Sequence, residues 1–167
     1  MKWILWSCIL VCTSIFGQHQ PKNWAFGLNA AGHLNKITEV GGSFHIDYAP
    51  TCFSTYSSEF GLYSYKNQLV PELNITINSM LYNFNSKAYI TGGMGFMVNS
   101  ANLSKKEQDR AVFDFSDGQT NFGAILKLRG LIVLSQWWQF STELNFKSVG
   151  GNFSTLTLGL VYELPIF

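Results

Sequence analysis

Hydrophobic and polar residues alternate with a period of two along most of the chain. In residues 154–167, Leu156, Leu158 and Leu160 share one side of an extended strand, and Thr157 lies on the other. This period is typical of β-strands, whose successive side chains point to opposite faces. Comparable stripes occupy residues 23–31, 39–48, 54–63, 73–81, 88–98, 120–130, 137–147 and 154–167. The pattern predicts eight strands, and no segment after the N-terminal region shows helical spacing.

The composition favours a membrane barrel over a water-soluble domain. Charged residues make up 13% of the chain and aromatic residues 16%, whereas soluble domains carry roughly 25% charged residues. Strands of about ten residues can cross a bilayer when tilted, and only a closed barrel satisfies all their backbone polar groups. We therefore predict an all-β fold, an eight-stranded antiparallel up-and-down transmembrane β-barrel. The net charge of +1 gives no reason to expect a nucleic-acid partner.

The N-terminal segment has the pattern of an export signal. Lys2 precedes an apolar run from Trp3 to Phe16, and Gly17 provides a small residue for cleavage. We expect residues 1–17 to be a signal peptide and residues 18–167 to form the barrel domain. The apolar run is shorter than the roughly 20 residues of a membrane-spanning helix. An uncleaved anchor is the alternative.

The connections between stripes are predicted to differ at the two ends of the barrel. Those that follow the odd-numbered stripes should be external and longer, and the others should be short periplasmic turns. The third external connection, around residues 99–119, is the only long one. It carries most of the loop charges, among them Lys105, Lys106, Glu107, Asp109 and Arg110.

Aromatic residues cluster where the stripes meet the connections. Rings of this kind favour the headgroup level of a bilayer, so two aromatic girdles are expected. One comprises Trp24, Tyr48, Phe53, Tyr82, Phe84, Trp137 and Trp138, and the other comprises Tyr63, Tyr65, Phe113, Phe115 and Phe153. Packed core aromatics in a soluble sandwich are the alternative explanation.

Charged residues also occur on the minority faces of the stripes. In a barrel of this size the interior is filled by side chains, and buried charges must pair. The residues expected to form a structural network inside the barrel are Asp47, Glu59, Lys127, Arg129, Glu143 and Glu163. A path for protons or small ions along the same residues is the alternative.

Catalytic motifs are absent from the sequence. It contains no zinc-binding H-E-x-x-H, no G-x-S-x-G elbow and no phosphate-binding loop. Ser43, His45 and Asp47 share one face, but strand neighbours two apart are separated by roughly 7 Å, which is too far for a direct relay. His33 is expected to be a solvated loop residue. We therefore predict no catalytic residues, no metal site and no cofactor.

The signal sequence, the eight two-faced stripes and the C-terminal aromatic residue resemble the small bacterial outer-membrane β-barrels. This group includes OmpX and the membrane domain of OmpA, and the short barrel proteins of the Bacteroidota are similar. The resemblance implies contact with outer-membrane lipid and recognition of the last strand by the barrel-assembly machinery. Phe167 departs from the family pattern because it is out of phase with Leu164 and Ile166, behind Pro165. Either the strand ends before Pro165, or the signal is read through Tyr162, Leu164 and Ile166.

Three functions are compatible with the sequence. The first is a non-enzymatic structural or accessory subunit of an envelope complex, such as a secretion, gliding or uptake machine, that presents the long external loop. The second is an outer-membrane enzyme that modifies lipid. The third is a soluble, exported, lipocalin-like binder of a small apolar ligand, which would require an apolar interior. We favour the first.

Overall fold

The structure is a computed structural model that describes residues 22–34, 36–84, 87–103, 115–116, 120–149 and 154–164. These residues form nine strands: β1 (Asn23–His33), β2 (Lys36–Ala49), β3 (Ser54–Tyr65), β4 (Gln68–Phe84), β5 (Ala88–Asn99), β6 (Phe115–Ser116), β7 (Asn121–Val133), β8 (Trp138–Lys147) and β9 (Thr155–Glu163). The described part contains no helix of the length and apolarity that a bilayer crossing requires.

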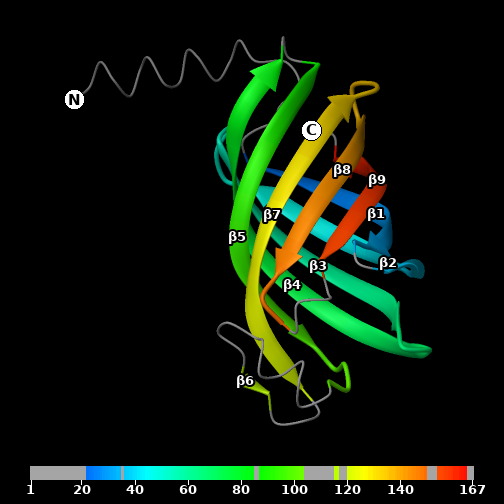
Figure 1. Cartoon of the computed structure of the whole chain (residues 1–167). Helices are drawn as coiled ribbons and strands as arrows, with labels where there is room; N and C mark the ends of the chain where they lie inside the picture. The colour runs from blue at the N-terminus through cyan, green and yellow to red at the C-terminus, as the bar shows by residue number, and fades with distance from the viewer. Residues whose placement is uncertain are drawn as a thin grey trace.

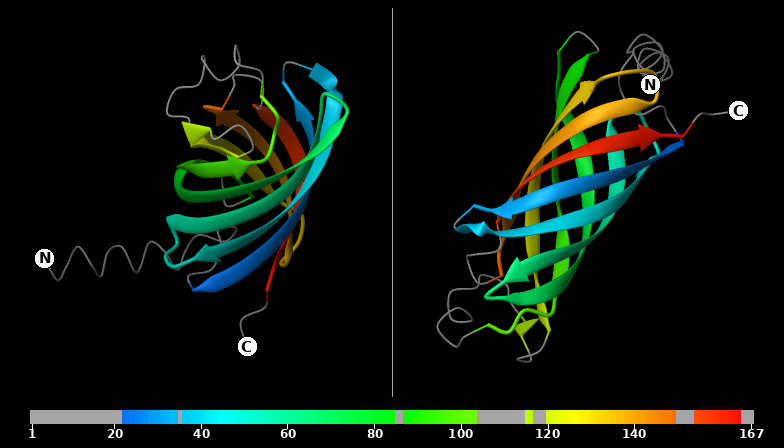
Figure 2. Two further views of the ribbon diagram at one scale, coloured as in Figure 1. Left: turned by 90° about the horizontal axis from the view of Figure 1, so that it is seen from below. Right: turned by 90° about the vertical axis from the view of Figure 1, so that its right-hand side faces the viewer.

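The strands form a closed antiparallel barrel (Figures 1 and 2). Each wall strand pairs with its neighbours in the chain, and β1 also pairs with β9, the last strand. The pairing of β5 with β7 closes the sheet, and β6 only adds a short ladder at the start of β7. In the described residues, eight strands thus make the wall, which confirms the predicted up-and-down barrel.

The connections are only partly as predicted. The long connection between β5 and β7 is at the expected end of the barrel, but at the same end only two residues separate β1 from β2 and β3 from β4. Both residues of the second connection, Lys66 and Asn67, have positive φ angles (47° and 62°), as a two-residue hairpin turn requires. The expectation of longer connections was wrong here because the strand ladders continue further than the hydrophobic stripes.

The alternating apolar and polar residues of each strand lie on the outer and inner faces of the barrel. Large apolar side chains point outward, such as Leu28, Ile75 and Leu126, whereas most side chains that fill the interior are polar. One register shift, between Met80 and Tyr82, places Leu81 and Tyr82 both on the outer surface. This is a β-bulge, which leaves two residues of one strand opposite one of its partner.

One aromatic girdle is present, whereas the two described members of the other point into the barrel. Trp24, Phe53, Tyr82, Phe84 and Trp138 are all exposed, at the barrel end where the 50–53, 85–87 and 134–137 connections lie. At the opposite end, Tyr63 and Tyr65 are buried inside the barrel. The prediction was wrong for these two because they have the inward phase of β3. Phe113 and Phe153 lie outside the described residues, and the side chain of Phe115 is not described.

Candidate functional site: the charged barrel interior

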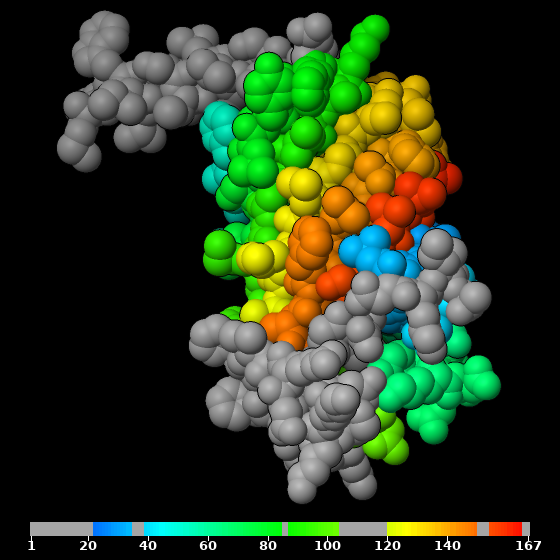
Figure 3. All heavy atoms as spheres, viewed as in Figure 1, coloured from blue at the N-terminus to red at the C-terminus, as the bar shows by residue number. Residues whose placement is uncertain are grey.

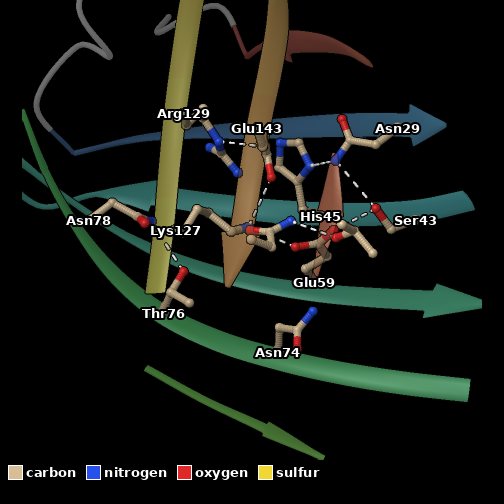
Figure 4. A network of polar contacts seen from close by, with 12 residues as sticks. Asn29, Ser43, His45, Glu59, Asn74, Thr76, Asn78, Lys127, Arg129 and Glu143 are labelled. Carbon is tan, nitrogen blue, oxygen red and sulfur yellow. Dashed lines mark hydrogen bonds and ion pairs between the residues drawn. The ribbon is translucent and has the colours of Figure 1, made fainter. Parts of the chain in front are cut away.

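Five of the six predicted interior charges meet in the middle of the barrel. Figure 4 labels four of them, Glu59, Lys127, Arg129 and Glu143. We call Asp47, Glu59, Lys127, Arg129 and Glu143 the central network. Lys127 Nζ lies 2.7 Å from Glu59 Oε2 and 3.1 Å from Glu143 Oε2. Arg129 Nη1 lies 2.6 Å from Asp47 Oδ2, and Arg129 Nε lies 2.6 Å from Glu143 Oε1. Glu143 therefore contacts both cations and joins the two halves of the network.

The barrel closure brings these residues together. Lys127 and Arg129 are two residues apart on β7, so both point inward. The β7–β8 register places Glu143 directly opposite Arg129. Asp47 and Glu59 instead reach the cations across the lumen from β2 and β3, the opposite side of the wall. All five side chains are buried, and buried charges are tolerated only when they are paired in this way.

Neutral side chains extend the central network toward β1. Ser43 Oγ donates a hydrogen bond to Glu59 Oε1 at 2.6 Å. Asn29 Nδ2 lies 3.3 Å from Ser43 Oγ and 3.1 Å from His45 Nδ1. Asn29 thus connects the serine to the histidine, which Figure 4 shows as one row of contacts.

The geometry of Ser43, His45 and Asp47 differs from the prediction in one respect. His45 Nε2 lies 3.5 Å from Asp47 Oδ2, so the expectation that neighbours two apart cannot meet was wrong for this pair. The side chains of His45 and Asp47 extend toward each other along β2, so their terminal atoms meet although their backbone positions are farther apart. Ser43 is hydrogen-bonded to Glu59 instead, and the three residues do not form a nucleophilic relay.

Gly27 on β1 makes room for the buried ring of His45. A Cβ atom at this position would overlap the imidazole ring, whereas a Cβ atom at Gly32 on the same strand would meet nothing. Gly27→Ala is therefore expected to destabilise the barrel by about 1–3 kcal/mol, the usual range for overpacking. Gly32→Ala is the matched control and should stay within about 0.5 kcal/mol. Urea unfolding in lipid vesicles measures both, and equal effects would contradict the packing described for His45.

Glu163, the sixth predicted residue, lies in a different group. Gln139 Nε2 donates a hydrogen bond to Glu163 Oε2 at 3.3 Å, and Tyr89 Oη donates to Gln139 Oε1 at 2.8 Å. These residues lie toward the barrel end that holds the described aromatic girdle, next to an apolar cluster of Ala25, Tyr89, Leu131 and Val161.

The sequence reasoning missed a second buried ion pair, between Lys147 and Glu72. Lys147 Nζ lies 2.5 Å from Glu72 Oε1 and 4.6 Å from the centre of the Tyr63 ring. Asn74 Nδ2 also donates to Glu72 Oε1, at 2.9 Å. The period of two, extended back by one step from Asn74, was the signal that could have revealed Glu72 as an inward residue.

Apolar residues close the interior at the end with the long connection. Tyr65, Val70, Met97, Ala101, Leu103, Ile125 and Val149 form one buried cluster there. His33 is also buried at this end, with 2% of its surface exposed, and its ring lies 5.9 Å from the Tyr63 ring, edge to face. The expectation of a solvated His33 was wrong because β1 continues to this residue with inward phase.

The arrangement fills the barrel rather than opening it. Charged groups occupy the centre, and apolar clusters lie on both sides of them along the barrel. Among the described residues, no group of three or more His, Cys, Asp and Glu side chains is arranged to hold a metal ion. The described ionic groups inside the barrel contact one another.

No protein-family model matches the chain, and neither does any curated protein sequence. Solved structures match over most of its length. The N-terminal barrel domain of OprF from Pseudomonas aeruginosa matches with a TM-score of 0.67 at 9% identity, over 86% of this chain and 98% of that one. A de novo designed transmembrane β-barrel matches with a TM-score of 0.65 at 12% identity, over 88% and 99%.

The chain has the fold of a small outer-membrane β-barrel. The same fold is used by the outer-membrane enzyme PagL, which matches with a TM-score of 0.52 at 8% identity, over 85% of this chain and 99% of that one. The fold therefore implies lipid contact around the wall. Because an enzyme shares it, the fold alone does not show whether this chain is catalytic. A lipocalin-like interior is excluded, because in the described barrel the charged side chains point inward and the large apolar ones outward.

Proposed function

We propose that this chain is a non-enzymatic outer-membrane β-barrel that serves as a structural or accessory subunit of an envelope complex. The observation that supports this best is the combination of an apolar outer wall with a filled, ion-paired interior. A plugged barrel offers no wide channel, so interaction falls to the wall and the connections. Loading of the last strand by the barrel-assembly machinery is part of the same proposal.

A lipid-modifying activity is not favoured by the described residues. Such an enzyme needs an acid–base group beside the lipid, and histidine is the most common one. Both described histidines, His33 and His45, are buried inside the barrel. The wall offers hydroxyl groups such as Ser58 among apolar neighbours, but no histidine in the described part accompanies them.

The long connection between β5 and β7 is proposed as the external interaction segment. Its charged residues Lys105, Lys106, Glu107, Asp109 and Arg110 lie outside the described residues, so their role rests on the sequence. The described turn at the opposite end of the barrel carries Lys87, which is exposed. Trypsin can therefore distinguish the two ends of the barrel on intact cells.

The first test combines fractionation with protease treatment. The chain is expected in the outer-membrane fraction, with a gel mobility that changes on heating. Trypsin on intact cells should cut within residues 105–110 and should reach Lys87 only after the outer membrane is opened. The variant Lys105→Gln/Lys106→Gln/Arg110→Gln is the matched control and should lose the cuts within residues 105–110. Cutting at Lys87 in intact cells would reverse the orientation, and recovery in the periplasmic fraction would refute the membrane barrel.

The accessory role needs a separate test. An amine-reactive crosslinker applied to intact cells should join the wild-type chain to a defined envelope protein through Lys105 or Lys106. The same triple-glutamine variant should lose this product while it keeps its heat-modifiable mobility. A wild-type chain that gives no product, or a product that persists in the variant, would contradict the proposed role of the segment.

A further inference from the structure

An apolar groove runs along the outer wall where the first and last strands meet. It has a volume of about 770 Å³, which is within the range of small-molecule sites. One side is formed by Phe26 and Phe44, the other by Trp138, Phe140 and Tyr162. Figure 3 shows this face, with β8 in orange, β9 in red and β1 in blue side by side.

Two groups of aromatic rings and several small residues line the groove. Phe26 stacks on Phe44 with 6.2 Å between ring centres, and Trp138 packs on Tyr162 at 4.9 Å. Ala30, four residues along β1 from Phe26 and opposite Leu158, lines the groove together with the backbone of Gly27 and Gly159. An apolar groove of this volume fits a flexible hydrocarbon chain.

A positive charge lies beyond the groove, at the barrel end that holds the aromatic girdle. Lys22 is exposed and directly precedes β1, and its backbone N–H donates to the carbonyl of Ala49 at 2.6 Å. At about 3.3 Å per residue, Lys22 lies about 13 Å along the strand from Phe26. Trp24 and Tyr48, whose ring centres are 4.8 Å apart, occupy the headgroup level between them.

We propose that this groove binds one phospholipid with an anionic headgroup, its acyl chain between the ring pairs and its phosphate near Lys22. The proposal rests on the membrane location proposed above. The groove is part of the lipid-facing wall, and the exposed Lys22 beyond it complements a phosphate at the headgroup level. A lipid held in this way covers the junction of β1 and β9, where the first and last strands of the described barrel pair.

Lipid retention tests the groove. The chain is reconstituted in vesicles of phosphatidylglycerol and phosphatidylethanolamine, extracted in mild detergent and analysed by native mass spectrometry. Wild type should retain about one phosphatidylglycerol per barrel. Ala30→Trp fills the groove and should lower retention at least fivefold. Ala124→Trp, at another outward alanine of the wall, is the matched control and should retain lipid like wild type.

The headgroup is tested by charge. Lys22→Glu should remove the preference for phosphatidylglycerol over phosphatidylethanolamine, and Lys87→Glu, at the same end of the barrel but outside the groove, should preserve it. Equal retention in wild type and Ala30→Trp would overturn the proposal. A wild-type dimer in detergent that Ala30→Trp converts to a monomer would also overturn it and assign the groove to a second copy. A chain that fails to insert, as judged by heat-modifiable mobility, would refute the membrane location itself.

Discussion

Replacement of Arg129 by methionine is expected to destabilise the folded barrel by about 3–5 kcal/mol, the usual cost of breaking a buried ion pair from one side. Arg129 contacts Asp47 and Glu143, each at 2.6 Å. The variant leaves both carboxylates without this cation in the interior, where an unpaired charge is poorly solvated. The measurement is the free energy of unfolding in lipid vesicles, followed by Trp fluorescence in urea.

Two further variants isolate the cause. Lys87→Met removes an exposed cation and should change the free energy of unfolding by less than about 0.5 kcal/mol. Asp47→Asn, introduced together with Arg129→Met, should recover part of the loss because it removes one of the two carboxylates that lose the Arg129 cation. If Arg129→Met alone changed the stability as little as Lys87→Met, the central network would have no structural role.

The wall of the barrel was predictable because it depends on one local feature of the sequence, the alternation of apolar and polar residues. Each stripe has one face toward apolar surroundings and one toward a polar interior, so a period of two identifies both strand and face. The fold class and the faces of residues such as Leu126 and Lys127 followed directly. The ends of the strands could not be predicted from the alternation, because the hydrogen-bonded strands continue past the apolar stripes. β4, for example, has 17 residues.

Partners across the lumen were not predictable in the same way. The alternation shows that Lys127 and Glu59 both point inward, but their contact depends on the stagger of β3 against β7, which no local pattern encodes. The same limit explains why Glu163, assigned to one network with the other charges, lies with Gln139 and Tyr89 instead. Glu72 was missed for a simpler reason, since its stripe was read only from residue 73 onward.

A charge placed on the outer wall distinguishes a membrane barrel from a water-exposed one. Leu128 lies near the middle of β7 and is 41% exposed, opposite Leu144 of β8. In a bilayer, Leu128→Arg is expected to cost about 2–4 kcal/mol, because arginine on the lipid face is most destabilising near the midplane. In water, an exposed leucine replaced by arginine would change stability by no more than about 0.5 kcal/mol.

Leu69 provides the matched control because it is the same residue type at a different depth. It is 68% exposed, beside the two-residue turn that begins β4, and Leu69→Arg should cost about 0–1 kcal/mol near the interface. The free energies of unfolding of both variants are compared in the same vesicles. A large cost at Leu128 with a small cost at Leu69 requires a lipid boundary between the two positions. Small and equal costs would mean that the apolar wall does not face lipid, and the membrane assignment would then fail together with the groove proposal.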